Sequence, residues 1–224
     1  MTIEELTSSV GKLRLVRQGA EAEVFEWRDG RVLKLLRARG ATERLACEVA
    51  AFEAAHSAGL RVPRAYEQVV MDGGPGLAME RLEGTDLLSV LGQKPWLVFR
   101  SGRLTGEIHA RINGARAPAS LPTVREVMRD ALARLAHREP AALADCAARI
   151  LGRLPDGEAL CHGDVHPGQL ILSNGQCAAF DCVGAKRGAF LFDYARTRVL
   201  LRRGEPPPGT QLPLDSLPKW GASF

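Results

Sequence analysis

Short apolar runs separated by glycine-containing turns occupy the first third of the chain. Residues 24–27 and 31–36 flank Arg28-Asp29-Gly30, and an Asp-Gly pair between two such runs predicts a β-hairpin. Residues 66–71 and 77–79 lie on either side of a second glycine-rich turn and predict another hairpin. This part of the chain is therefore expected to form a small antiparallel sheet.

Alanine-rich and periodic segments predict helices in most of the remaining chain. One run begins after Thr42, the expected N-cap, and ends near Gly59, so a single helix would accompany the sheet. After a connector at 80–84, further helices are expected at 87–91, 97–112, 124–136 and 141–154. Short apolar runs at 170–172 and 177–180 predict a late hairpin.

Composition and charge narrow the class of protein. The chain has 224 residues, enough for one two-lobed domain, and its formal charge of +4 comes from scattered arginines without a basic run. This balance suits a small anionic ligand and argues against a nucleic-acid partner. Five cysteines without a C-x-x-C pair argue against a disulfide framework and a zinc site. The N-terminus is acidic and no apolar run approaches ~20 residues, so we expect a cytoplasmic protein without a membrane span.

The chemistry-bearing residues gather between positions 161 and 181. Asp164 lies in a short loop, Gln169 follows five residues later, and Asp181 closes an apolar run. A kinase needs one carboxylate to orient the acceptor hydroxyl, and an amide with a second carboxylate to hold Mg²⁺ on the ATP phosphates. The alternative for both aspartates is an ordinary turn residue.

The loop sequence His162-Gly163-Asp164-Val165-His166-Pro167-Gly168-Gln169 resembles the H-G-D-x-H-x-x-N motif of the aminoglycoside phosphotransferase and choline kinase-like family. Residues 180–188 and 193–197 are similar to that family's I-D-W-x-x-A-x-x-G…D-x-A stretch. The resemblance implies an α+β, bilobal, protein-kinase-like fold with a shortened, mainly helical C-lobe. We expect a nucleotide-binding N-lobe, a C-lobe with the catalytic loop, and an irregular proline-rich tail, at residues 1–80, 81–201 and 202–224.

The resemblance also implies roles for individual residues. Asp164 would be the catalytic base, and Gln169 and Asp181 would hold Mg²⁺. The two loop histidines, His162 and His166, are expected to fix the loop backbone through hydrogen bonds and not to act in the chemistry.

The implied nucleotide contacts begin at Lys34, a charge inside a strand-like apolar run. It would contact the ATP phosphates while paired with Glu48 of the following helix. Glu43 and Glu53 are competing partners, and the alternative for each of these charges is a solvated side chain.

Position in the chain suggests the remaining nucleotide contacts. Gly19 lies where a phosphate-covering loop belongs, and its neighbouring backbone N–H groups would meet phosphate. Glu80 and Leu82 lie in the connector, where backbone groups would meet the adenine edge. Asp193 corresponds to the last acid of the family pattern and is expected to brace the catalytic loop.

Two departures from the family pattern leave alternatives open. Gln169 stands in place of asparagine, and Cys182 stands in place of tryptophan. The expected function is an ATP- and Mg²⁺-dependent phosphotransferase acting on a hydroxyl of a small polar molecule. A catalytically weak or inactive nucleotide-binding module is the alternative, because one extra methylene shifts the amide ligand of a geometrically demanding cation. A kinase acting on a polypeptide is disfavoured, because Cys182-Val183 replaces Phe-Gly and no A-P-E segment follows.

Overall fold

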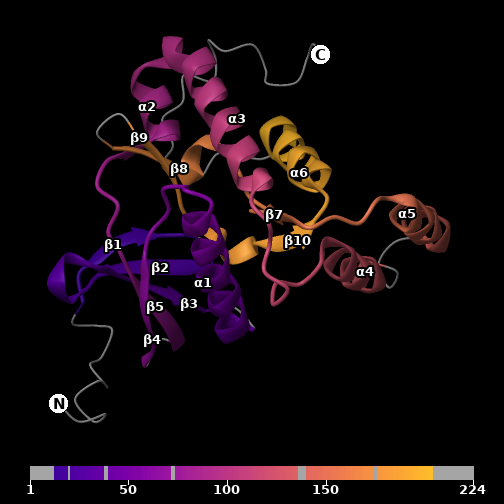
Figure 1. The fold of residues 1–224 in the computed structure, drawn as a ribbon, viewed down its shortest axis with the longest axis horizontal. Coiled ribbons are helices and arrows are strands. Elements are labelled where there is room, and N and C mark those ends of the chain that lie inside the picture. Colours follow the sequence, from indigo (N-terminus) through magenta and orange to yellow (C-terminus); the bar gives the residue numbers. More distant parts are fainter. Residues whose placement is uncertain are drawn as a thin grey trace.

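A five-stranded antiparallel sheet forms the N-terminal lobe of the computed structural model, which describes residues 13–19, 21–37, 40–71, 74–135, 140–173 and 176–203 (Figure 1). Its strands lie in the order β1 (Leu15–Gln18), β2 (Ala22–Glu26), β3 (Val32–Leu36), β5 (Gly74–Met79) and β4 (Ala65–Met71). All five residues of the central strand β3 are buried. Both predicted hairpins of this lobe are thereby confirmed.

The turn between β2 and β3 shows why the Asp-Gly signal worked. Asp29 and Gly30 have φ angles of 57° and 69°, in the left-handed region that most L residues avoid. Aspartate and glycine tolerate this region, and two such residues in succession suit the right-handed twist of a hairpin.

Helix α1 (Ala41–Ser57) accompanies the sheet, but its predicted start was wrong. The N-cap position belongs to Gly40, with φ of 68°, and Thr42 already lies inside the helix. The glycine supplies the left-handed turn that leads into the helix, so no side-chain cap is made there. Buried residues recur at helical spacing, and Glu48 is among them.

The C-terminal lobe is mainly helical. It holds α2 (Leu87–Gln93), α3 (Val98–Gly114), α4 (Val124–Leu135), α5 (Ala141–Arg153) and α6 (Phe190–Arg203). Its strands are β6 (Thr85–Asp86), β7 (Ala159–Cys161), β8 (Leu170–Ser173), β9 (Gln176–Ala179) and β10 (Lys186–Gly188), paired as β6-β8-β9 and β7-β10. The four predicted helices and the late hairpin are confirmed to within two residues. The sequence did not predict α6, β6, β7 and β10.

One apolar core runs through both lobes and fixes their arrangement. It includes Phe52 of α1, Leu87 of α2, Ile108 of α3 and Leu160 of β7. The connector that joins the lobes ends at Gly84, where φ is 140° and an added Cβ would lie 2.4 Å from the Leu172 carbonyl oxygen. The backbone at Gly84 therefore packs directly against β8 where the chain enters the C-lobe.

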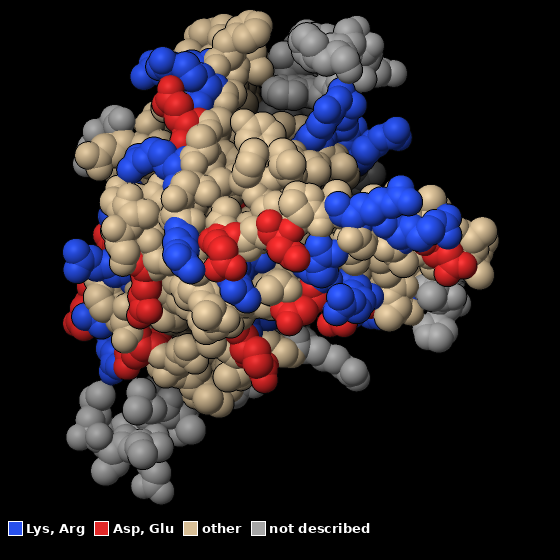
Figure 2. Space-filling model, turned by 45° about the vertical axis from the view of Figure 1, so that its right-hand side comes forward, with Lys and Arg blue, Asp and Glu red and all other residues tan. Residues whose placement is uncertain are grey.

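The face drawn in Figure 2 carries charges of both signs, and the described helices include none that could span a membrane. Lys and Arg side chains are interspersed with Asp and Glu over the face drawn in Figure 2. Among the described residues, no helix is both long and apolar enough to cross a bilayer. Residues 204–224, most of the predicted proline-rich tail, lie outside the described residues.

Candidate active site

A buried lysine in the middle of the sheet is the centre of the candidate site. The Lys34 side chain is 4% exposed, and its Nζ donates to both carboxylate oxygens of Glu48 at 2.8 and 2.9 Å. Glu43 and Glu53 are exposed, so Glu48 is the glutamate of α1 that faces the strand. A cation and an anion from neighbouring elements thus compensate each other inside the N-lobe.

The same ammonium group also links the two lobes. Lys34 Nζ donates to Asp181 Oδ1 at 2.6 Å. Burial by itself would lower the pKa of Lys34, but the Glu48 and Asp181 carboxylates outweigh that effect and raise the pKa to about 12. Lys34 is therefore a permanent cation, held between two acids.

Asp181 adopts a backbone conformation that is uncommon for a side-chain-bearing residue. Its φ and ψ are 63° and 52°, in the left-handed region that aspartate tolerates better than most residues. The short 3₁₀ turn that follows, Cys182–Gly184, runs beside α1, and the Cys182 N–H donates to Glu48. This turn fixes Asp181 to the same helix that holds the partner of Lys34.

The loop between β7 and β8 brings the other two predicted residues, Asp164 and Gln169, to Asp181. Gly163 makes this approach possible, because its φ is 84° and an added Cβ would lie 2.6 Å from the Gly184 carbonyl oxygen. The Gln169 amide nitrogen donates to Asp181 Oδ2 at 3.1 Å and to Asp164 Oδ2 at 3.4 Å. The two acids are therefore joined through one amide.

The donors at this point suit a small hard cation. The Gln169 Oε1 atom is buried and has no hydrogen-bond partner among the described residues, while the amide nitrogen of the same group bonds the Asp181 carboxylate. Mg²⁺ takes oxygen ligands and is usually held by one or two protein groups together with phosphates. In the described part of the chain, no cluster of three or more His, Cys, Asp or Glu side chains could hold a metal ion. Gln169 and Asp181 are the two residues here whose oxygens could hold such a cation.

The neighbours of both acids keep them ionised. Burial by itself would raise the pKa of Asp164. The nearby His166, Gln169 and Arg196 together lower it by more than burial raises it, so the net pKa is below the ordinary value. Burial likewise raises the pKa of Asp181, and Lys34 more than reverses this effect. Both groups can therefore serve as anions at neutral pH.

A family model described as "Phosphotransferase enzyme family" matches residues 12–212. The chain belongs to this phosphotransferase family. A search of curated proteins gave no match.

Solved structures with the same fold include antibiotic phosphotransferases. A thermostable mutant of aminoglycoside phosphotransferase APH(4)-Ia is 16% identical with a TM-score of 0.62, over 86% of this chain and 78% of that chain. The streptomycin–ATP ternary complex of APH(2")-IIa is 12% identical with a TM-score of 0.56, over 85% and 72%. Macrolide 2'-phosphotransferase MphH from Brachybacterium faecium is 21% identical with a TM-score of 0.53, over 90% and 80%. These likenesses establish a kinase-like fold, shorter here than in those chains.

In this member of the phosphotransferase family, helix α6 holds the loop of residues 162–169 through a set of contacts that we call the α6 clamp. Asp193 is 1% exposed and accepts the His162 and Gly163 N–H groups, both at 2.7 Å. One turn later, Arg196 Nε donates to the Gly163 carbonyl oxygen, and Thr197 Oγ1 donates to the Val165 carbonyl oxygen at 2.9 Å. One helix face thus makes four hydrogen bonds to three loop residues, His162, Gly163 and Val165.

Two side chains of α3 contact Asp193 from the protein interior. Asn113 Nδ2 donates to its Oδ2 at 3.0 Å, and His109 Nε2 lies 3.5 Å from the same oxygen. His109 in turn stacks on Tyr194, with ring centroids 5.0 Å apart. This network gives a physical basis for the bracing role expected of Asp193.

The two loop histidines make backbone contacts, as expected. His162 is buried, with Nε2 3.0 Å from the Phe180 carbonyl oxygen. His166 Nδ1 accepts the Gly168 N–H at 3.1 Å, while its Nε2 lies 3.6 Å from Asp164 Oδ2. His166 therefore also faces the predicted base.

The predicted phosphate-covering loop lies between β1 and β2. Gly19 closes a tight turn, because its N–H donates to the Ala22 carbonyl oxygen at 2.8 Å; Ala20 lies outside the described residues. Glu21, an acid near the expected phosphates, is paired with Arg44 at 2.5 Å. Arg17 of β1 lies over the Phe180 ring at 5.5 Å, so this edge of the sheet meets the C-lobe beside Asp181.

The two connector residues have different surroundings. The Glu80 carboxylate accepts bonds from Arg61 at 2.5 and 2.9 Å, and its backbone N–H donates to the Arg64 carbonyl oxygen at 2.8 Å. Leu82 is half-buried and lines a small cavity with Arg61 and Ile171. The adenine-binding role of Glu80 and Leu82 stays a prediction.

Sequence reasoning missed Arg196, Arg17 and the partners of Asp193. Arg196 lies three residues after Asp193, and helical spacing would have placed both on the loop-facing side of α6 had that helix been predicted. Arg17 and His109 carried no signal, because their contacts join residues more than 80 positions apart.

Proposed function

We propose that this protein transfers the γ-phosphoryl group of ATP to a hydroxyl of a small polar molecule. The observation that carries the proposal is the continuous chain of contacts Glu48–Lys34–Asp181–Gln169–Asp164, which joins the two lobes. It supplies a phosphate-binding cation, two oxygen donors for Mg²⁺ and an ionised acceptor-facing acid in one place. Family membership and the nucleotide in the related streptomycin–ATP complex support it.

The N-lobe groups would bind and orient the triphosphate. Lys34 is fixed by Glu48, so its ammonium group can turn from Asp181 to phosphate oxygens without losing its buried counter-ion. Backbone N–H groups near Gly19 would cover the phosphates, and connector backbone at Glu80 and Leu82 would meet the base. This assigns nucleotide binding to the 1–80 lobe and acceptor orientation to the 81–201 lobe.

Gln169 and Asp181 would hold Mg²⁺, through the unpartnered amide oxygen and the carboxylate. When bound, the cation neutralises charge on the phosphates and so favours attack by a nucleophile. To hold it, the Gln169 amide would turn its oxygen, in place of its nitrogen, toward Asp181.

Asp164 would act on the acceptor. Its carboxylate accepts the hydroxyl hydrogen bond and takes the proton as the acceptor oxygen forms its bond to the γ-phosphorus. The bond from that phosphorus to the β-bridging oxygen breaks, and ADP leaves with the electron pair. The α6 clamp holds Asp164 for this step through Gly163 and Val165.

The alternative, a nucleotide-binding module with little or no catalysis, rests on Gln169. Its N–H group bonds both acids, so the amide competes with a cation for them. A shorter asparagine would not span the same two carboxylates equally well. Q169N therefore separates the functions: a large gain in turnover would favour the module, and a measurable turnover of the unsubstituted protein that Q169N leaves unchanged or reduces would favour the enzyme.

Calorimetric titration of the purified protein with ATP, with and without Mg²⁺, tests the proposal first. We expect saturable, Mg²⁺-dependent binding that D181N reduces by at least ~10-fold, followed by ADP release in a screen of hydroxylated small molecules that includes aminoglycosides and macrolides. D145N, the same change at an exposed aspartate of α5, is the matched control for loss of a carboxylate. Absence of ATP binding under both conditions would refute the proposal. Binding without turnover on any acceptor would favour the module.

A further inference from the structure

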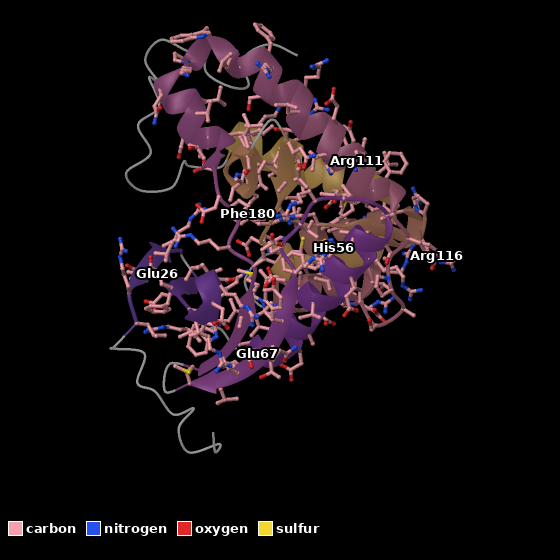
Figure 3. The ribbon with its side chains drawn as sticks, turned by 60° about the vertical axis from the view of Figure 1, so that its left-hand side comes forward. Glu26, His56, Glu67, Arg111, Arg116 and Phe180 are labelled. Carbon is pink, nitrogen blue, oxygen red and sulfur yellow. The ribbon has the colours of Figure 1, made fainter. Side chains whose placement is uncertain are left out.

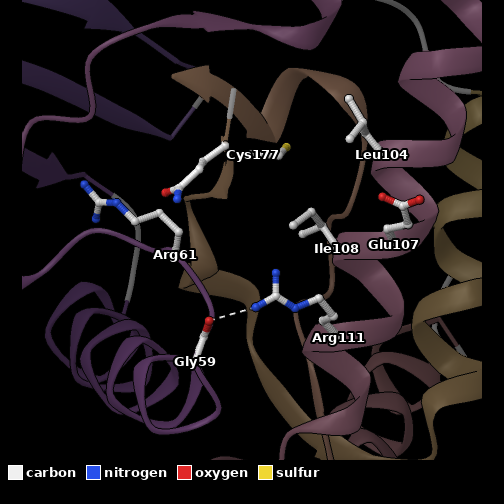
Figure 4. Close-up of a pocket in the computed structure, with 8 residues that line it drawn as sticks. Gly59, Arg61, Leu104, Glu107, Ile108, Arg111 and Cys177 are labelled. Atoms are coloured by element: carbon white, nitrogen blue, oxygen red, sulfur yellow. Dashed lines mark hydrogen bonds between the residues drawn. The ribbon is translucent and has the colours of Figure 1, made fainter. Parts of the chain in front are cut away.

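A second site is suggested by a cavity outside the Lys34–Asp164 chain of contacts. It has a volume of about 340 Å³ and lies where the end of α1 meets α3 and β9 (Figure 4). Gly59 and Arg61 contribute from the N-lobe, while Leu104, Ile108, Arg111 and Cys177 contribute from the C-lobe. Both lobes therefore build its wall.

The charges around this cavity do not balance. Arg61 is neutralised by Glu80 at 2.5 Å, and Glu107, also in the wall, lies 3.6 Å from Arg103. Arg111 donates one bond, to the Gly59 carbonyl oxygen at 2.7 Å, and has no carboxylate within ion-pair distance among the described residues. One net positive charge thus remains at the cavity, on a group with further N–H donors.

The remaining wall consists of two apolar side chains of α3, the Cys177 thiol and the exposed Gln176. Leu104 and Ile108 lie one turn apart on α3, and Ile108 is 5% exposed. Cys177 of β9 faces the same space with a half-buried thiol, whose pKa burial raises, so it is present as the neutral thiol. Figure 4 shows the Arg111 guanidinium with one nitrogen bonded to the Gly59 carbonyl oxygen. A ligand that fits needs one anionic group and a short apolar body.

The cavity lies among contacts that hold the two lobes together. The Gly59–Arg111 bond joins the N-lobe to α3, and the Arg61 carbonyl oxygen accepts the Ala179 N–H at 3.1 Å. The Arg61 side chain holds Glu80, the first residue of the connector. A molecule bound here would contact both lobes behind that connector.

We propose that this cavity binds a small organic monoanion, a carboxylate or phosphate with a short apolar body, through Arg111, and that its occupancy stabilises the arrangement of the lobes described above. The binding part stands independently of the proposed function, whereas an effect on nucleotide affinity rests on it. Ligands that favour one lobe arrangement in common strengthen each other's binding.

Titration of the nucleotide-free ¹⁵N-labelled protein with benzoate tests the binding part, with neutral benzamide as the matched compound. We expect saturable benzoate shifts at the amides of Gly59, Arg61 and Cys177 below about 10 mM, and at least ~10-fold weaker binding of benzamide. R111M should lose at least ~10-fold in benzoate affinity. R116M, the same change at an exposed arginine outside the cavity, should leave the affinity unchanged (Figure 3).

Two further variants separate charge from shape. L104W keeps Arg111 but fills the cavity and should abolish the shifts. E107Q removes the only acid in the wall and should strengthen benzoate binding by about 2–5-fold. No saturation by about 10 mM, equal binding of benzamide, or R111M binding like the unsubstituted protein would overturn the site.

The ATP affinity with and without saturating benzoate then tests the regulatory part. We expect ATP to bind more tightly in its presence, and benzoate to bind more tightly in the presence of ATP by the same factor. Equal affinities would overturn the regulatory part. A protein that binds benzoate but not ATP would refute the proposed function and leave the cavity site supported.

Discussion

The two lobes are joined by polar contacts at two separate places, and these contacts differ in burial more than in length. At the candidate active site, Lys34 Nζ lies 2.6 Å from Asp181 and is 4% exposed. At the cavity, Arg111 lies 2.7 Å from the Gly59 carbonyl oxygen and is exposed to solvent. Two contacts of similar length therefore differ greatly in the free energy that is lost when each is broken.

Burial decides what each contact does for the protein. Charges removed from water must stay paired, so the Lys34 cluster can exchange partners but cannot be left without them. An exposed cation loses little when a bond is broken, and it can accept an additional partner at low cost. The first contact is therefore suited to exchange with a highly charged ligand, and the second to recruitment of a weakly charged one.

Removing the buried cation should have the largest effect. K34M leaves Glu48 buried beside Asp181 without its counter-ion, and we expect ~3–5 kcal/mol lower unfolding free energy together with loss of ATP binding. Urea unfolding and calorimetry measure the two effects. The double variant K34M/E48L should recover part of the stability and none of the binding. A K34M protein of unchanged stability would show that the pair is not strongly coupled.

Removing the predicted base should affect rate without affecting stability. D164N keeps the shape of a side chain whose residue is partly exposed, and we expect turnover to fall ~10²–10⁴-fold with ATP affinity within about threefold of the original. Steady-state kinetics on an identified acceptor and an ATP titration provide the comparison. Turnover within a factor of about two would remove Asp164 from its assigned role.

Weakening the α6 clamp should give an intermediate effect on both properties. D193N keeps an oxygen acceptor but loses the charge that the His162 and Gly163 N–H groups share, so we expect ~2–3 kcal/mol lower stability. Hydrogen exchange of those two amides should accelerate relative to the amides of β3. If exchange rises equally everywhere, Asp193 stabilises the whole fold and not the loop in particular.

The same residue gives a pH dependence with a definite sign. Burial raises the pKa of Asp193, but bonds from His109, Asn113 and Gly163 lower it more, so its folded value lies below the ordinary 3.8. Its stabilisation is therefore fully present above about pH 4 and is lost as the pH falls through the folded pKa. We expect the unfolding free energy, measured from pH 6 to pH 2, to decline less steeply in D193N than in the unsubstituted protein. The difference should appear below about pH 4.

The smallest effect is expected at the exposed contact. R111M should lower the unfolding free energy by only ~0–1 kcal/mol, because the broken bond is solvated on both sides. Urea unfolding of R111M beside K34M tests the comparison directly. A loss in R111M that approaches the loss in K34M would mean that exposure does not separate the two contacts.

Local signals in the sequence were enough for most of the fold and for the core of the site. Asp-Gly turns, helical periodicity and the 162–169 motif each depend on neighbouring residues, and these are the features that the structure confirms or brings together. Lys34 and Glu48 could be paired because strand and helix are adjacent in the chain. The functional roles of the site residues stay predictions.

What the sequence could not predict depends on distant residues. Helix α6 carries exposed apolar residues, including Phe190, Val199 and Leu201, so its periodicity points to no single face. Strands β6, β7 and β10 have two or three residues each and are defined only by their partners. The predicted cap at Thr42 failed because the backbone of Gly40 supplied the turn instead.

The connector confines where the lobes can rotate. Upstream, the Glu80 N–H and carboxylate are tied to Arg64 and Arg61, and downstream Gly84 is pressed against the Leu172 carbonyl oxygen. Only residues 81–83 lie between these two fixed points of the backbone. So short a link leaves the lobes little room to separate along the connector.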